Sequence, residues 1–271
     1  METGLLRDLL TGVVGLLTGA LSGALGVGGA TISTPGIRLL GVAPLVAVGT
    51  TLPAILPSAV AGGLRYRAEG LVDWRVVAIA GPAGMGASVG GALLAGLVPG
   101  EGHLLQLLTA VLLGASAWRT IASLGGSEDG DAAEDAADGP AAKGSAAPPA
   151  SVVAGVGAAA GVLSGLLGIG GGVLLVPAFH QIGLSMRVSI ATSLVCVGML
   201  AVPGTLAHAA LGNIDWRVAV VLAVTVVPGA RLGAAASLRL RDRRLTQVVA
   251  VMLGAIAVVY GGAELAALWR G

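Results

Sequence analysis

Two glycine-rich stretches decide how this chain folds: GALGVGGATISTPG at residues 23–36 and GLLGIGGGVLLVPA at residues 165–178. They lie in long apolar segments at roughly 9–40 and 152–183. A segment of about 32 residues would be about 48 Å long as one helix, whereas the hydrocarbon core of a bilayer is about 30 Å thick. The glycines and prolines concentrate in the second half of each segment. We therefore expect each segment to be a discontinuous helix or a re-entrant hairpin.

The composition of the whole chain is typical of a helical membrane protein. Of its 271 residues, 55% are hydrophobic and 11% are charged, and 46 are glycines. Small residues let membrane helices approach one another closely. The strands of an outer-membrane barrel would alternate apolar and polar residues, but the apolar runs here are continuous. The sequence predicts an all-α polytopic protein of the cell membrane, with the lipid bilayer as its surroundings.

Charge and cysteine content exclude several function classes. The net charge is +1, and no basic run is interleaved with aromatic residues, so we expect no nucleic-acid partner. Cys196 is the only cysteine, so it cannot form an intrachain disulfide, and we expect a buried packing residue. We predict no cofactor and no metal site. The first residues, METGLLRDLL, lack an A-x-A-like cleavage pattern, so we expect the first apolar segment to belong to the mature protein.

About eight hydrophobic segments are bounded by charged residues, proline or glycine. They lie at roughly 9–40, 43–64, 76–98, 104–124, 152–183, 188–207, 218–238 and 245–268. The stretch between the two sets of four is acidic and rich in alanine and proline, so we expect a flexible linker there. The predicted organisation is a membrane repeat at 1–124, a linker at 125–150 and a second membrane repeat at 151–271.

The two sets of segments are related by an offset of 142 residues. Gly19–Gly29 and Gly161–Gly171 share eight identities in eleven positions. The same offset aligns Pro35 with Pro177, Thr50-Thr51 with Thr192-Ser193, and the DWRV sequence at 73–76 with that at 215–218. GASVG at 86–90 pairs with GARLG at 229–233 after a one-residue shift, which places Ser88 opposite Arg231. Two homologous four-segment repeats are typical of secondary transporters.

The distribution of Lys and Arg bears on the topology. If all eight segments cross the membrane, the repeats are parallel and the basic residues of the loops divide eight to six. If the first segment of each repeat returns to its own side, the repeats are inverted and the division is ten to four. The richer side, which the positive-inside rule makes cytoplasmic, holds Arg65, Arg67, Arg75, Arg119, Lys143, Arg187, Arg239, Arg241, Arg243 and Arg244. This favours an inverted pseudo-two-fold arrangement, with the parallel arrangement as its alternative.

The glycines that recur in both repeats are the first candidates for a binding site. Gly28, Gly29, Gly170 and Gly171 would unwind the helix and present backbone N–H groups and a positive dipole end to an anion. The alternative is ordinary close packing of helices at small residues. The hydroxyls of Thr50, Thr51, Thr192 and Ser193, in the next segment, could complete the coordination of an oxyanion or a cation. Their alternative is a bond to a carbonyl of their own helix.

Arg231 is a further candidate because it lies inside a predicted span. A cation there is costly and by default indicates function, and every Asp and Glu lies in a loop, in the linker or near a chain end rather than beside it. A substrate anion could supply the missing partner, whereas the alternative is snorkelling toward the interface. We expect His180, His208, Arg38 and Arg187 to lie at the ends of spans. Trp74 and Trp216 have the character of interface anchors.

The paired motifs resemble those of the sulfite exporter TauE/SafE family, also described as the toluene sulfonate uptake permease family. The resemblance rests on LSGALGVGGATISTPG at 21–36 and LSGLLGIGGGVLLVPA at 163–178, each followed by (G/A)T(T/S)L and (G/A)xxDWR elements. It covers roughly 12–124 and 152–265. It implies a permease for a small anion, sulfite, a sulfonate or a related sulfur compound, with organic acids as substrates of some members.

Three other functions are alternatives to this expectation. An anion channel could use the same scaffold, and an organic-acid permease would differ only in its substrate. An intramembrane hydrolase built on Ser22 or Ser164 with His180 or His208 is disfavoured, because the Ser-Gly pair occurs twice at what looks like a packing position. We therefore do not expect an enzyme. The sequence leaves open the coupling ion, H+ or Na+, and whether the protein is a homo-oligomer.

Overall fold

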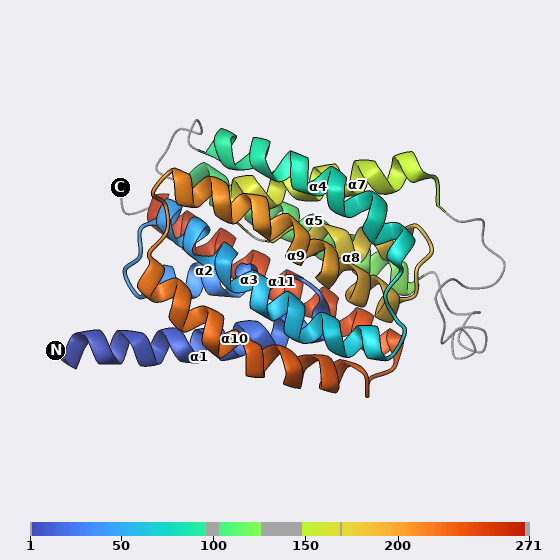
Figure 1. Ribbon diagram of the computed structural model, residues 1–271, viewed down its shortest axis with the longest axis horizontal. Coiled ribbons are helices and arrows are strands. Elements are labelled where there is room, and N and C mark those ends of the chain that lie inside the picture. The colour runs from blue at the N-terminus through green and yellow to red at the C-terminus, as the bar shows by residue number, and fades with distance from the viewer. Residues whose placement is uncertain (1, 96–102, 126–147, 169, 269–271) are drawn as a thin grey trace.

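The computed structural model describes residues 2–95, 103–125, 148–168 and 170–268, which form ten helices and no strand (Figure 1). The first half contains α1 (Glu2–Leu25), α2 (Ala30–Leu39), α3 (Pro44–Ala68), α4 (Trp74–Ala95) and α5 (His103–Gly125). The second half contains α7 (Ala150–Leu167), α8 (Gly172–Gln181), α9 (Met186–Ala210), α10 (Trp216–Ser237) and α11 (Asp242–Leu268). Six of these, α1, α3, α4, α7, α9 and α10, are long and apolar enough to cross a membrane.

The described residues contain ten helices rather than eight segments because each glycine-rich stretch separates two helices. Three glycines in the first stretch, Gly26, Gly28 and Gly29, have φ values of 66°, 86° and 68°. Their counterparts Gly168, Gly170 and Gly171 have φ values of 65°, 79° and 68°. A residue with a Cβ rarely adopts this conformation, so glycine lets the chain leave the helix there. Most of the predicted linker, 126–147, lies outside the described residues.

The short helices after the glycines turn back along the long ones. In Figure 1, α1 runs from the N-terminal end toward the middle of the molecule, and α2 returns toward the side where α1 began. The pair α7 and α8 makes the same turn from the opposite end. The two glycine stretches, which we call the first break (Gly26–Gly29) and the second break (Gly168–Gly171), therefore meet inside the molecule.

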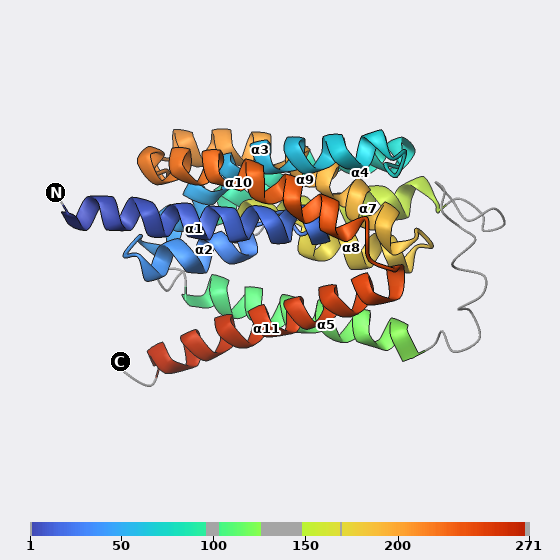
Figure 2. The same ribbon diagram turned by 90° about the horizontal axis from the view of Figure 1, so that it is seen from below.

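Helices α1 and α7 each pack closely against a helix of the other half, α10 and α4 respectively (Figures 1 and 2). The glycines that permit this approach lie at four-residue spacing. They are Gly15, Gly19 and Gly23 on α1, which contact Leu222, Val226 and Ala230, and Gly157, Gly161 and Gly165 on α7, which contact Ala80, Gly84 and Ser88. A Cβ on any of them would collide with the opposing backbone or an adjacent side chain. Small residues thus join the two halves by direct backbone packing.

Helices α3 and α9 form the centre of the bundle. They are the most buried of the six candidate spans, and they contact each other as well as α10 and α4. Helices α5 and α11 pair with each other and form a separate layer on one side (Figure 2). The centre therefore brings α3 and α9 against both breaks.

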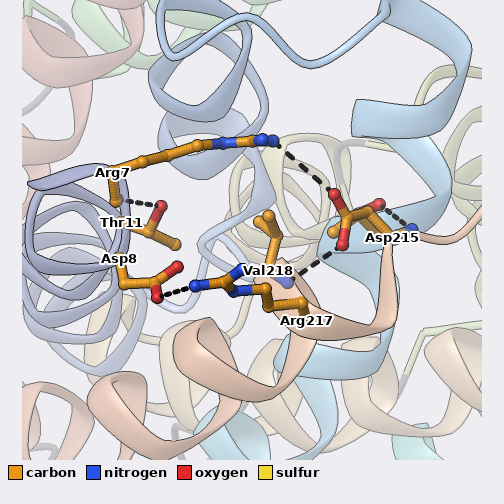
Figure 3. A network of polar contacts seen from close by, with 7 residues as sticks. Arg7, Asp8, Thr11, Asp215, Arg217 and Val218 are labelled. Atoms are coloured by element: carbon orange, nitrogen blue, oxygen red, sulfur yellow. Dashed lines mark hydrogen bonds and ion pairs between the residues drawn. The ribbon is translucent and has the colours of Figure 1, made fainter. Parts of the chain in front are cut away.

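The N-terminal part of α1 is tied to the start of α10 by charged side chains (Figure 3). The Arg7 guanidinium lies 3.5 Å from the Asp215 carboxylate, and Arg217 donates to Asp8 at 2.6 Å. Asp215 also accepts a hydrogen bond from the Val218 N–H at 3.2 Å, which caps α10. The second copy of the DWR motif therefore begins a helix and fixes α1 to it.

Candidate anion site at the two glycine breaks

The first and second breaks contact each other through their middle glycines. A Cβ placed on Gly28 would lie 3.4 Å from the Gly170 carbonyl oxygen, and one on Gly170 would lie 3.4 Å from the Gly28 carbonyl oxygen. Two apolar side chains border the contact, because the same positions lie 2.7 Å from Val197 Cγ1 and 3.1 Å from Ile55 Cδ1. The structure thus brings together two of the predicted site glycines, one from each half.

Five backbone N–H groups of the breaks form no hydrogen bond with the residues that the structure describes. No hydrogen bond to the N–H groups of Val27, Gly28, Gly29, Gly170 or Gly171 is formed by the described residues. All five residues are buried. A buried N–H group without a partner is costly, and nearly all such groups in folded proteins are paired. Five of them in two touching breaks are suited to bind an acceptor from outside the chain.

The short helices add their dipoles to these donors. Helix α2 begins after Gly29 and α8 after Gly171, and neither N-terminus has a side-chain cap. Both N-terminal ends lie at the breaks, so each adds a partial positive charge. Gly29 also packs against Thr18 and Ser22 of α1, and Gly171 packs against Ala160 and Leu200. These two glycines are therefore enclosed by the protein on one side.

The predicted hydroxyls divide into two kinds. Thr50 Oγ1 accepts a hydrogen bond from the Asp215 N–H at 2.9 Å, and Thr192 Oγ1 accepts one from the Asp73 N–H at 3.0 Å. These threonines therefore join each half to the start of α10 or α4 in the other half. In the structure these two hydroxyls connect the halves and do not lie at the contact between the breaks.

Thr51 and Ser193 make contacts of another kind. Ser193 Oγ donates to the Gly26 carbonyl oxygen at 2.7 Å, so it contacts the first break directly. Thr51 Oγ1 donates to the carbonyl oxygen of Val48 at 3.0 Å and lies 3.2 Å from Thr34 Oγ1 of α2. Both side chains are fully buried. Of the four predicted hydroxyls, Ser193 is the one that holds a break residue.

Arg231 lies apart from these groups. It is exposed on α10, next to Leu232, which is also exposed. The neighbouring Ala230 faces Gly23 of α1, and in the other half Ser88 faces Gly165 in the same way. The structural partner of Ser88 is therefore Ala230, at the offset of 142, and the one-residue shift that paired it with Arg231 is wrong. One residue along a helix turns the side chain by about 100°, which points Arg231 outward.

The sequence analysis missed two residues that hold the breaks in place. Tyr66 Oη donates to the Gly23 carbonyl oxygen at 2.7 Å, and His208 Nε2 lies 3.2 Å from the Gly165 carbonyl oxygen. Both rings are fully buried. Tyr66 and His208 are 142 residues apart, as are Gly23 and Gly165. This shared offset is the signal that could have identified them, although His208 was considered as a residue at the end of a span.

The two breaks are not equivalent in their polar contacts. Ser58 Oγ donates to Ser22 Oγ at 3.1 Å beside the first break. At the corresponding place in the second half Leu200 replaces Ser58, and Ser164 Oγ is buried with no hydrogen-bond partner in the part of the chain that the structure describes. The other polar residues considered above bind nearby backbone: His180 Nδ1 lies 3.0 Å from the Leu184 oxygen, and Arg187 donates to the Leu240 oxygen at 2.7 Å.

Comparison with known proteins finds relatives that are membrane transporters. A family model described as "Sulfite exporter TauE/SafE" matches residues 11–260. The probable membrane transporter protein YunE of Bacillus subtilis strain 168 is 26% identical over 260 residues, which cover 89% of this chain and 92% of that protein. A probable membrane transporter protein of Xylella fastidiosa strain Temecula1 is 28% identical over 254 residues, 90% of this chain and 91% of that protein. No solved structure matches the chain significantly.

Proposed function

The chain belongs to the sulfite exporter TauE/SafE family, and we propose that it is a secondary transporter for a small sulfur-containing anion. The protein is a multi-pass membrane transporter of that family. The proposed substrate is sulfite, a sulfonate or a related sulfur compound, and the proposed location is the cytoplasmic membrane. The site is the contact between the first and second breaks.

One observation carries the proposal: the two breaks, which touch at Gly28 and Gly170, contain five buried N–H groups without a partner in the described chain. Backbone donors that replace the water around an oxyanion need no net positive side chain, since the N-terminal dipoles of α2 and α8 supply the charge. Ile55 and Val197 beside the contact keep the surroundings apolar, which strengthens each hydrogen bond to an ion.

We propose that the two halves are inverted repeats that move relative to each other around this site. The directions of α1–α2 and α7–α8 in Figure 1 support this arrangement over the parallel one. The contacts of Thr50 with Asp215 and of Thr192 with Asp73 recur at the same offset, which supports two equivalent halves. Alternating access would then expose the breaks to one side of the membrane and then to the other.

The proposal predicts saturable uptake into liposomes that contain the purified protein. The probes are labelled sulfite and sulfoacetate, with labelled acetate to represent organic acids. The test variant is Gly170→Leu/Gly171→Leu, which fills the second break, and its control is Gly86→Leu, where no atom lies within 4 Å of the added Cβ. We expect uptake of a sulfur anion to be lost in the test variant and retained in the control.

Two results would reject the proposal. Uptake of acetate in place of the sulfur anions would favour an organic-acid permease. A current that does not saturate with concentration would favour an anion channel on the same scaffold. Elution of the variants at the wild-type volume in size-exclusion chromatography distinguishes a filled site from a misfolded protein.

A further inference from the structure

Tyr66 and His208 occupy corresponding positions in the two halves, but one contact is made by a phenol hydroxyl and the other by an imidazole ring. Each ring lies in the last turns of a central helix, α3 or α9, and each bonds a glycine carbonyl three residues before a break. Helices α3 and α9 run in opposite directions in Figure 1, so the two contacts lie toward opposite ends of the bundle. Each ring thus fastens the C-terminal end of α1 or α7 just before a break.

The two hydrogen bonds differ in how their donor side chains respond to pH. The Gly165 carbonyl can only accept, so His208 Nε2 carries the hydrogen in this contact. In a neutral ring Nδ1 is then an acceptor, and it is buried without a hydrogen-bond partner among the described residues. Histidine changes its charge between about pH 5 and 8, whereas a tyrosine hydroxyl stays neutral there. His208 can therefore take a proton at Nδ1 where Tyr66 cannot.

The elements around His208 offer few charges to stabilise an imidazolium in the buried position. Helix α7 contains no charged residue, and the charged residues of α3 and α4 are Arg65, Arg67 and Arg75, at the opposite end of the bundle. Asp215 follows in the connection from α9 to α10, but its carboxylate caps α10 and pairs with Arg7. A charged His208 is therefore destabilised as long as its ring stays buried.

We propose that His208 is a proton-binding residue of the transport cycle and that its protonation releases the C-terminal end of α7. A proton from the adjacent solution binds at Nδ1, and the imidazolium is stabilised only when the ring reaches water. The ring must then leave the Gly165 carbonyl, which frees the end of α7 next to the second break. This inference rests on the proposed function and names H+ as the coupling ion. The contact of Tyr66 with Gly23 does not respond to pH.

Hydrogen exchange read by mass spectrometry tests the release without any substrate. Exchange of the C-terminal halves of α7 and α1 is measured at about pH 5.5 and pH 7.5 and corrected for the intrinsic pH dependence. In the wild type we expect at least threefold faster corrected exchange in α7 at the lower pH, and no change in α1. In His208→Gln, which keeps an N–H donor for Gly165 but does not titrate, the response of α7 should vanish.

A second variant moves the response to the other half. Tyr66→His places a titratable ring opposite Gly23, so corrected exchange in α1 should become faster at the lower pH. His180→Gln, at a histidine that bonds the Leu184 carbonyl and not a break, is the control and should leave the wild-type pattern unchanged. An α7 response that persists in His208→Gln, or its absence in the wild type, overturns the proposal.

Uptake into liposomes measures whether anion transport is coupled to protons. An inward proton gradient should stimulate sulfite uptake several-fold in the wild type, and His208→Gln should lose this stimulation while it still exchanges anion across the membrane. If stimulation is unchanged in His208→Gln, the proposal is wrong whatever the substrate. Absence of sulfite uptake in the wild type would instead count against the proposed function, and the exchange measurement would still decide the role of His208.

Discussion

Ser193 of α9 donates a hydrogen bond of 2.7 Å to the Gly26 carbonyl oxygen, which ends the last turn of α1. This bond links the centre of the second half to the break of the first half, 167 residues away in the chain. It satisfies one of the carbonyls that a helix C-terminus leaves open. A site made of backbone groups depends on such contacts, because backbone donors have no side-chain rotamers with which to adjust.

Ser193→Ala should lower stability by about 1 kcal/mol, since an interhelical hydrogen bond in a membrane contributes about 0.6 to 2 kcal/mol. It should also raise the KM for anion uptake, because the first break loses one of its supports. The control is Ser189→Ala, whose hydroxyl lies 3.5 Å from the Leu184 oxygen. Thermal unfolding in detergent and liposome uptake measure the two effects. Equal KM values for the two variants would show that Ser193 does not position the break.

Thr50→Val and Thr192→Val should each destabilise the protein by about 1 kcal/mol, because the partly buried N–H of Asp215 or Asp73 loses its acceptor. The KM should stay within about twofold of the wild-type value, since neither hydroxyl lies at the break contact. Thr225→Val is the matched control, because its hydroxyl bonds carbonyls of its own helix. A tenfold rise in KM in Thr192→Val with unchanged stability would return this residue to the binding site.

Gly19→Ala and Gly161→Ala should each destabilise the protein by more than about 2 kcal/mol. The added Cβ would collide with the backbone of Val226 or Gly84, which cannot move without separating α1 from α10 or α7 from α4. Gly155→Ala, with no atom within 4 Å of the new Cβ, should be neutral or slightly stabilising. Thermal unfolding of the three variants provides the comparison. A neutral Gly161→Ala would contradict the close packing of α4 and α7.

Arg231→Gln should leave anion uptake within about twofold of the wild-type rate, because the side chain is exposed on α10 away from the breaks. The measurement is initial uptake at a substrate concentration below KM, where loss of a substrate contact has its largest effect. A loss of more than tenfold in a protein that still folds would mean that Arg231 reaches the anion in another state of the cycle.

The glycine breaks could be predicted from the sequence because their cause is local. Only glycine suits the positive φ values at Gly28 and Gly170, and its recurrence at one offset separates these positions from ordinary packing glycines. The family resemblance, carried by the same residues, is confirmed. The number of helices was less predictable, since hydropathy alone does not separate α2 from α1 or α8 from α7.

Contacts between distant residues could not be predicted from the sequence. Thr50 and Thr192 accept from backbone N–H groups 165 and 119 residues away, and nothing in their local sequence indicates that use. The pairing of Ser88 with Arg231 followed from a one-residue shift that improved the match of identities in GASVG and GARLG, whereas packing follows the unshifted offset. Tyr66 and His208 went unpaired because they are different residue types, although they make the same contact.

Binding of sulfite to the purified protein, measured by isothermal titration calorimetry, tests the central claim most directly. The variant is Gly28→Ala/Gly170→Ala, which disturbs the donor geometry at the contact of the two breaks, and the control is Gly86→Ala/Gly90→Ala on open positions of α4. The account predicts one saturable site whose affinity falls at least tenfold in the variant and is unchanged in the control. Equal affinity in the variant, with the protein still folded, would contradict a site built from these backbone groups.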